Sequence, residues 1–393
     1  MSGGAHPAVT GPLDAARALA PRIRARAGEI EAGRQLPPDL VRDIANAGLF
    51  KVAVPEAEGG LGADVVTTLR VIEEIACADG SAGWCVAMGI NTFRQSAQLA
   101  RPVRREIFYS DPVGVSAGSA NSRGRAVAVP GGYRVSGHWF FASGCMHSSA
   151  LHGACKVFDG DAPRLLPNGD QEVRIAFFYP KSQARIVDTW DVSGLRGTGS
   201  HDIVVDDVFV PDERTFSVLD RRARVTGPMN RMHGFDLAGC GFCCVGLGVA
   251  RAAIEAFVEL ANAKTPRSSA ELLRERVSAQ AQVGEAAAIL RSGRALLFEV
   301  VEEMWRTALA AQPITEGQRA DLRLAMTHAA QSAARATHMV CAAAGTTSIF
   351  TKSPLERYAR DAEVVTRHNQ LQAVNYEAVG RTLFGLASNS PLF

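Results

Sequence analysis

The chain lacks an excess of charge of either sign. Its 42 Lys and Arg residues oppose 40 Asp and Glu residues, so the formal net charge of the 393-residue chain is only +2. Such a balance produces no strong field that would attract nucleic acid or an anionic membrane surface. Residues 1–17 also lack an apolar stretch of signal-peptide length, and we expect no later segment to span a bilayer. The sequence therefore predicts a cytoplasmic protein without nucleic-acid or membrane partners.

The eight cysteines lack the spacing of a disulfide framework. They lie among Ala, Gly and Val residues, where reduced and buried thiols are the expected state. Cys240, Cys243 and Cys244 lie close together, but no second Cys or His pair follows them at zinc-site spacing. We therefore expect these side chains to be small residues at a helix–helix contact, and we predict no metal site.

Three regions of different character divide the chain, which is too long for a single core. Residues 1–111 show helical periodicity, with Pro at one helix start and Gly48 near its end. Residues 112–220 are strand-like and contain a predicted hairpin with Gly131 and Gly132 at its turn. Residues 221–393 contain four long helical segments. These helices predict a bundle, with cofactor sites between facing helices or at the bundle ends.

The most informative motif is the run WDVSGLRGTGSHDIVVDDVFVP at 190–211. Its three glycines permit backbone conformations that are closed to other residues, and its Arg, Thr, Ser and His side chains supply hydrogen-bond donors. The β-branched residues that follow predict a strand. By itself, the same run is equally compatible with a solvent-exposed turn between two strands.

Taken in order, several motifs resemble those of the acyl-CoA dehydrogenase superfamily over nearly the whole chain. They are LPPDLVRDIANAGLFKVAVPEAEGGLGAD, IACADGSAGW, GGYRVSGHWFFASG, the 190–211 run and AAAGTTSIFTKSPLERYARDAEVV. The resemblance implies an α+β fold with a helical N-terminal domain (1–111), a middle β-barrel or sandwich domain (112–220) and a C-terminal four-helix bundle (221–393). It also implies a homotetramer that assembles through the bundle.

The base that a dehydrogenase requires is missing from both places where this superfamily carries it. Removal of a proton next to a thioester carbonyl needs a carboxylate beside the flavin. One such place reads RHNQ, with Asn369 at the position of the Glu, and the other reads FDLAGC, with Ala238 there. Neither side chain can take a proton. An acyl-CoA dehydrogenase or oxidase with a base from elsewhere, and a non-catalytic homologue, remain as alternatives.

The chain is more similar to the branch of two-component, group D flavin-dependent monooxygenases, which includes the oxygenase component of p-hydroxyphenylacetate hydroxylase and dibenzothiophene monooxygenase. That resemblance implies an enzyme that receives reduced FMN or FAD from a separate NAD(P)H:flavin reductase. With O2 as cosubstrate, a C4a-hydroperoxyflavin would hydroxylate or oxygenate a small, aromatic or heteroatom-bearing molecule. Such chemistry needs a dry pocket and no base.

The same resemblance assigns residues to the site. His368, just after the Arg-Asp helix, and Ser143, near flavin N5, take the catalytic positions. The residues expected at the flavin are Ser116, Phe141, Ala142, Ser143, Gly144, Trp190, Arg267, Gly345, Thr346 and Thr347. Those expected at the substrate are Trp84, Asn91, Arg94 and His368. Asn91 and Arg94 stand where aromatic-hydroxylating relatives carry a histidine, and an inward Arg94 would suit an anionic substrate group.

Each of these positions also has an ordinary structural explanation. His368 lies in a polar run typical of a surface, Ser143 fits a strand-end hydroxyl bonded to the backbone, and Trp190 fits a core aromatic residue. His138, His147 and His152 are further candidates. Strand alternation places them on faces that the sequence does not determine.

Overall fold

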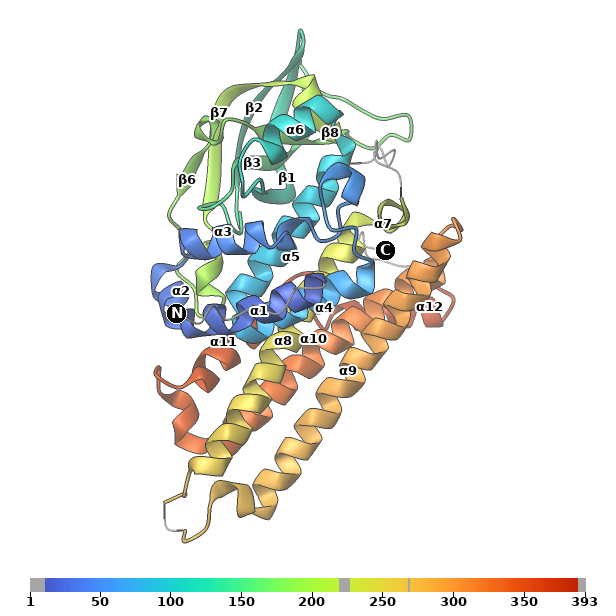
Figure 1. The fold of residues 1–393 in the computed structure, drawn as a ribbon. Helices are drawn as coiled ribbons and strands as arrows, with labels where there is room; N and C mark the ends of the chain where they lie inside the picture. The colour runs from blue at the N-terminus through green and yellow to red at the C-terminus, as the bar shows by residue number, and fades with distance from the viewer. Residues whose placement is uncertain (1–10, 219–226, 268, 388–393) are drawn as a thin grey trace.

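The structure, a computed structural model, describes residues 11–218, 227–267 and 269–387 (Figure 1). Within these residues, helices lie before and after a single β-sheet along the chain. In Figure 1 the sheet occupies one end of the molecule, most of the N-terminal helices lie across the middle, and the long C-terminal helices extend away from the sheet. The N-terminal helices are α1 (Pro12–Ala25), α2 (Ala27–Gly33), α3 (Pro38–Asn46), α4 (Val65–Ala78), α5 (Gly80–Gln95) and α6 (Arg101–Tyr109).

Eight strands form the sheet in the order β6-β7-β2-β1-β3-β5-β8, with β4 paired to β3. All pairs are antiparallel except β1 with β3. The predicted hairpin is confirmed, because β1 and β2 pair across the turn at Gly131, whose φ of 80° favours glycine. The strands are β1 (Ser116–Val129), β2 (Gly132–Trp139), β3 (Ala150–Asp159), β4 (Ala162–Pro163), β5 (Val173–Phe178), β6 (Arg185–Val187), β7 (Asp202–Pro211) and β8 (Thr215–Ser217).

The sheet core is built around Trp139, which is fully buried and donates from Nε1 to the Ala154 carbonyl at 2.8 Å. Glycines surround its ring. A Cβ at Gly124 or Gly153 would lie 2.3 Å from a ring atom, and one at Gly137 would lie 2.5 Å away. These three strand positions are therefore glycine because the indole occupies the space that a side chain would need.

The C-terminal part consists of α7 (Pro228–Arg231), α8 (Gly234–Ala263), α9 (Val277–Leu309), α10 (Glu316–Ala344), α11 (Pro354–Thr366) and α12 (Asn375–Leu383). Three of these helices are long, and the shorter α11 packs against α8 and α10. Small residues let α8 approach its neighbours closely: a Cβ at Gly248 would lie 2.4 Å from the Glu73 carbonyl of α4. The expected helix–helix role of the α8 cysteines is confirmed, since all are buried and Cys243 Sγ donates to the Met326 carbonyl at 3.4 Å.

The expectation that no segment has the length and apolarity of a membrane span is wrong for α8. Among the described residues it is the one helix long and apolar enough to cross a membrane, with a window of mean hydropathy 1.8. However, 83% of that window is buried inside the protein, as befits the central helix of a bundle. In the same described part of the chain, no group of three or more His, Cys, Asp or Glu side chains is placed to hold a metal ion.

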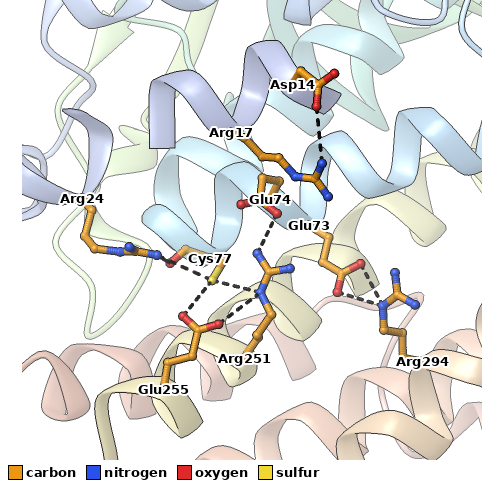
Figure 2. Close-up of polar contacts among 9 residues, drawn as sticks. All are labelled: Asp14, Arg17, Arg24, Glu73, Glu74, Cys77, Arg251, Glu255 and Arg294. Carbon is orange, nitrogen blue, oxygen red and sulfur yellow. Dashed lines mark hydrogen bonds and ion pairs between the residues drawn. The ribbon is translucent and has the colours of Figure 1, made fainter. Parts of the chain in front are cut away.

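Polar contacts connect the N-terminal helices to the bundle (Figure 2). The guanidinium of Arg251 on α8 reaches Glu74 at 2.9 Å and Cys77 Sγ at 3.1 Å, both on α4. Glu73 of α4 is buried and accepts from Nε of Arg294 on α9 at 2.9 and 3.0 Å. Since a buried carboxylate needs such a partner, this ion pair ties α4 to α9 and holds the helical regions as one body.

Candidate active site

A cavity of about 590 Å³ lies where the sheet meets the helices. One face of α5 contributes Trp84, Met88, Asn91 and Gln95, which recur at helical spacing. The other walls come from residues 118–121 of β1, the 190–200 turn, the start of α8 and the turn after α11. The cavity therefore draws on all three regions of the chain.

The 190–200 turn is packed against the protein rather than exposed as a solvent turn. Leu195, Gly197 and Thr198 are buried, and a Cβ at Gly197 would lie 2.1 Å from a side-chain carbon of Ile30. Two buried side chains from other helices hold it in place. Asp361 of α11 accepts from the Leu195 amide at 2.6 Å, and Ser81 of α5 accepts from the Gly197 amide at 3.1 Å.

Residues 141–144 lie against this turn through backbone hydrogen bonds. The Ala142 amide donates to the His201 carbonyl at 3.0 Å, and the Gly144 amide donates to the Thr198 carbonyl at 2.8 Å. Phe141 has a φ of 65° and is 62% exposed, and its ring meets that of Trp190 edge-on at 6.1 Å. Phe141, Ser143 and Trp190 line the cavity, whereas Ala142 and Gly144 are not among its lining residues.

His368 lies in the cavity wall against two aromatic rings that stack on each other. Its ring centroid is 4.5 Å from that of Phe242 and 5.8 Å from that of Trp84. Burial, together with the nearby Arg323 charge, lowers the pKa of His368 to about 4 from its ordinary value of 6.5. The imidazole is therefore neutral at physiological pH. Its Nδ1 accepts from the Gln370 amide at 3.4 Å, so Nε2 carries the hydrogen.

His152 lines the cavity, whereas His138 and His147, the other two candidate histidines, are not among the lining residues. It is 4% exposed, and its Nδ1 shares a 2.8 Å hydrogen bond with the Ser116 hydroxyl. Ser116 is thus placed behind His152 rather than among the lining residues. Burial lowers the pKa of His152 to about 4, so this ring is neutral as well.

Arg94 is placed differently from the prediction. Its side chain lines a separate cavity of about 430 Å³. A Cβ added at Gly234, at the start of α8, would lie only 2.0 Å from Nη2 of Arg94. Burial lowers the pKa of Arg94 to about 10, against the effect of Asp236. Asn91 faces the main cavity, but Arg94 does not supply it with the expected cation.

Four residues predicted to contact flavin lie away from the cavity. Arg267 is exposed in the loop after α8, and the turn Gly345–Ile349 follows α10 at the end of the bundle remote from the sheet (Figure 1). Lys264 Nζ donates to the Ala344 carbonyl and to Thr347 Oγ1, both at 2.7 Å. The Gly345–Thr347 segment therefore lies close to the loop that carries Arg267. Within one chain, neither segment reaches the cavity.

The cavity lining also decides which bases are available. Ala238 and Asn369, at the two positions where the superfamily carries a base, both line the cavity. In the described parts of the chain, the lining residues include no Asp or Glu. The geometry therefore offers aromatic rings, hydroxyls, amides, the Arg367 guanidinium and two neutral imidazoles. The carboxylate that a dehydrogenase uses is therefore absent from both superfamily positions, and burial makes the two imidazoles weak bases, with pKa values of about 4.

Comparisons with known proteins agree with this arrangement. Residues 13–100 match the family model "Acyl-CoA dehydrogenase, N-terminal domain", and residues 240–373 match "Acyl-CoA dehydrogenase, C-terminal domain". The indole-3-acetate monooxygenase of Pseudomonas putida is 37% identical over 93% of this chain and 91% of its own. The oxygenase subunit HsaA of the flavin-dependent monooxygenase of Rhodococcus jostii is 28% identical over 89% of this chain and 92% of its own.

A solved structure shows the same fold over the full length. The 3-HSA hydroxylase from Rhodococcus sp. RHA1 superimposes with a TM-score of 0.89 at 26% identity, covering 98% of this chain and 100% of that one. The predicted fold class is therefore confirmed. The chain belongs to the acyl-CoA dehydrogenase superfamily, within its branch of flavin-dependent monooxygenases.

Proposed function

We propose that this protein is the oxygenase component of a two-component flavin-dependent monooxygenase. It would use O2 and reduced FMN or FAD, delivered by a separate NAD(P)H:flavin reductase, to hydroxylate or oxygenate a small aromatic or heteroatom-bearing molecule. The observation that carries the proposal is the cavity itself. Its described lining has no carboxylate at either superfamily position, and burial lowers the pKa of both histidines to about 4, which makes them weak bases.

The residues around the cavity fit a planar heteroaromatic cofactor. Phe141 and Trp190 supply aromatic surface, Ser143 a hydroxyl and residues 118–121 backbone polar groups, a combination typical of cofactor pockets. We place flavin N5 at Ser143. When bound, the reduced flavin would supply the electrons that activate O2, and the protein would bind, orient and exclude water.

The substrate would lie on the α5 side of the cavity. Asn91 Oδ1 and Gln95 Oε1 are buried there without a hydrogen-bond partner, which is costly unless a ligand supplies a donor. Trp84 and Phe242 stack at 4.4 Å beside them and provide an apolar surface for a ring. We therefore propose an aromatic substrate that carries an N–H or O–H group, with the Nε2–H of His368 as a further donor toward it.

The remaining flavin contacts require assembly. We propose that Arg267 and the turn at Gly345, Thr346 and Thr347 serve the flavin phosphate of a neighbouring subunit in a homotetramer. Large exposed apolar side chains near that turn and on α12 support such an assembly: Ile349, Phe350, Leu383 and Phe384 are all at least half exposed. The three-domain division at 111 and 220, and a cytoplasmic location, belong to the same proposal.

The first test is rapid mixing of anaerobic protein and reduced FMN, or reduced FAD, with oxygenated buffer. We expect a protein-dependent delay between the loss of reduced flavin and the appearance of oxidised flavin. Oxidation at the rate of free flavin would contradict the proposal. Bleaching of bound oxidised FAD by an acyl-CoA ester would instead favour a dehydrogenase or oxidase.

The second test concerns His368. His368→Ala should increase the peroxide released per reduced flavin consumed, because Trp84 and Phe242 lose the ring that packs against both of them in the cavity wall and water gains access. The matched control is His338→Ala, a histidine exposed on α10 and outside this cavity. Equal peroxide yield in both variants would remove His368 from the mechanism.

A further inference from the structure

A continuous chain of hydrogen bonds runs through the wall of the cavity. Trp84 Nε1 donates to Ser143 Oγ at 3.1 Å, and Ser143 Oγ lies 2.7 Å from Ser200 Oγ. Ser200 Oγ lies 2.7 Å from Thr198 Oγ1, which donates to the Leu195 carbonyl at 2.8 Å. The three hydroxyl residues are between 2% and 7% exposed, so water does not compete for these contacts.

The direction of this chain follows from counting hydrogens. An indole N–H can only donate, a carbonyl can only accept, and each hydroxyl has one hydrogen. The Leu195 carbonyl accepts from the Thr198 amide at 3.1 Å, from Trp190 Nε1 at 3.2 Å and, at the shortest distance, from the Thr198 hydroxyl. With the hydrogen of Thr198 assigned to that carbonyl, Ser200 donates to Thr198. The hydrogen of Ser200 is then used, so Ser143 must donate to Ser200. Ser143 Oγ receives the indole hydrogen and retains one lone pair for the cavity.

We propose that this chain presents Ser143 to the cavity as an acceptor only, so that the site selects reduced over oxidised flavin. The inference rests on the proposed function, in which Ser143 meets flavin N5. Reduced flavin carries a hydrogen on N5 and satisfies the lone pair of Ser143. Oxidised flavin presents a lone pair at N5, so two acceptors face each other in a site from which water is excluded.

Thr198 is the positioning residue of this hydrogen-bond chain, because its contact with the Leu195 carbonyl sets the direction in which Ser200 and Ser143 donate. The backbone on both sides of Thr198 is itself held by hydrogen bonds. Asp361 accepts from the amide of Leu195, and Ser81 accepts from the amide of Gly197, so both flanks of Thr198 are tied to neighbouring helices. For Ser143 to donate into the cavity while the chain stays intact, all three hydroxyls would have to rotate and Thr198 would have to leave the carbonyl.

The test is a pair of dissociation constants, for reduced and oxidised FMN, measured by anaerobic ultrafiltration. We expect the wild type to bind reduced FMN more tightly. In Thr198→Val, Ser200 loses its acceptor and can donate to Ser143, which frees the Ser143 hydrogen for the cavity. The preference for reduced FMN should then fall roughly five- to tenfold, the value of about one neutral hydrogen bond. Ser200→Ala should have the same effect, whereas Thr198→Ser, which retains the hydroxyl, should keep the preference.

Ser143→Ala separates this inference from the proposed function. If Ser143→Ala changes FMN affinity while Thr198→Val and Ser200→Ala keep the wild-type preference, the direction of the chain does not control the site and the inference is wrong. If Ser143→Ala leaves both constants unchanged, Ser143 does not meet N5, and that part of the proposed function fails together with the inference. A preference that falls in Thr198→Val and Ser200→Ala but not in Thr198→Ser supports it.

Discussion

Protonation of His152 should destabilise the protein in mild acid. Burial lowers its folded-state pKa to about 4, whereas the ordinary value of 6.5 applies to the unfolded chain. Between these two values the unfolded chain binds more protons than the folded protein, so stability falls as the pH decreases. The contribution of the neutral ring is therefore complete above pH 6.5 and is lost progressively as the pH falls toward 4.

The size of the effect follows from the two pKa values. For a single site shifted from 6.5 to about 4, linkage gives a loss in free energy of unfolding of about 2 kcal/mol between neutral pH and about pH 5. His152 is only 4% exposed, so solvent screening does little to reduce this figure. A loss of this size is a sizeable share of the stability of an ordinary domain.

The assay is urea unfolding of wild type and His152→Gln at about pH 7.5 and about pH 5. The variant removes the titrating group, so its loss of stability between the two pH values should be smaller than that of the wild type by about 2 kcal/mol. Ser116→Ala is the control, because it removes the hydrogen-bond partner and leaves His152 buried and titrating. The reasoning is refuted if His152→Gln loses as much stability as the wild type over this pH range.

Three further changes test the packing and the site. Burial, followed by repulsion from Asp79, raises the pKa of Asp361 to about 7, so its ionisation lowers the free energy of unfolding as the pH rises. Asp361→Asn should therefore remove a loss of about 3 kcal/mol between about pH 5 and about pH 8, measured by urea unfolding. Gly153→Ala places a Cβ 2.3 Å from Trp139 and should lower the free energy of unfolding by about 3 kcal/mol, whereas Gly28→Ala, with open space around it, should not lower it. Asn91→Leu should reduce the preference in kcat/KM for an aromatic N–H substrate over its N-methyl analogue roughly tenfold, and an unchanged preference would place the substrate elsewhere.

Local patterns in the sequence determined the order of the elements. Helical periodicity and the stop signals that follow it depend on residues close together in the chain, which is why the helix at 316–344 is predicted with the bounds it has. The Gly131–Gly132 hairpin is local for the same reason. The lack of a carboxylate at the two superfamily positions was also readable from sequence, since Ala238 and Asn369 are identified by their motifs and the structure places both at the cavity.

Contacts between distant residues were decided only by the tertiary structure. Trp84, Ser143 and Ser200 come from three separate parts of the chain, and no local pattern shows that they form one hydrogen-bonded row. Burial on both faces of β3 has the same consequence: its first six residues are all buried, so alternation could not show which way His152 points. A register shift after Val135 of β2 likewise changes the face on which His138 lies.

Helix geometry explains the difference at α5. Asn91 and Gln95 are four residues apart and face one cavity, whereas Arg94 lies at the edge of that face and its long side chain reaches a second cavity beside the start of α8. The sequence determined that polar residues follow Trp84 on this helix. Which of them meets the site depended on how α8 packs across α5, and that packing is a property of the folded protein alone.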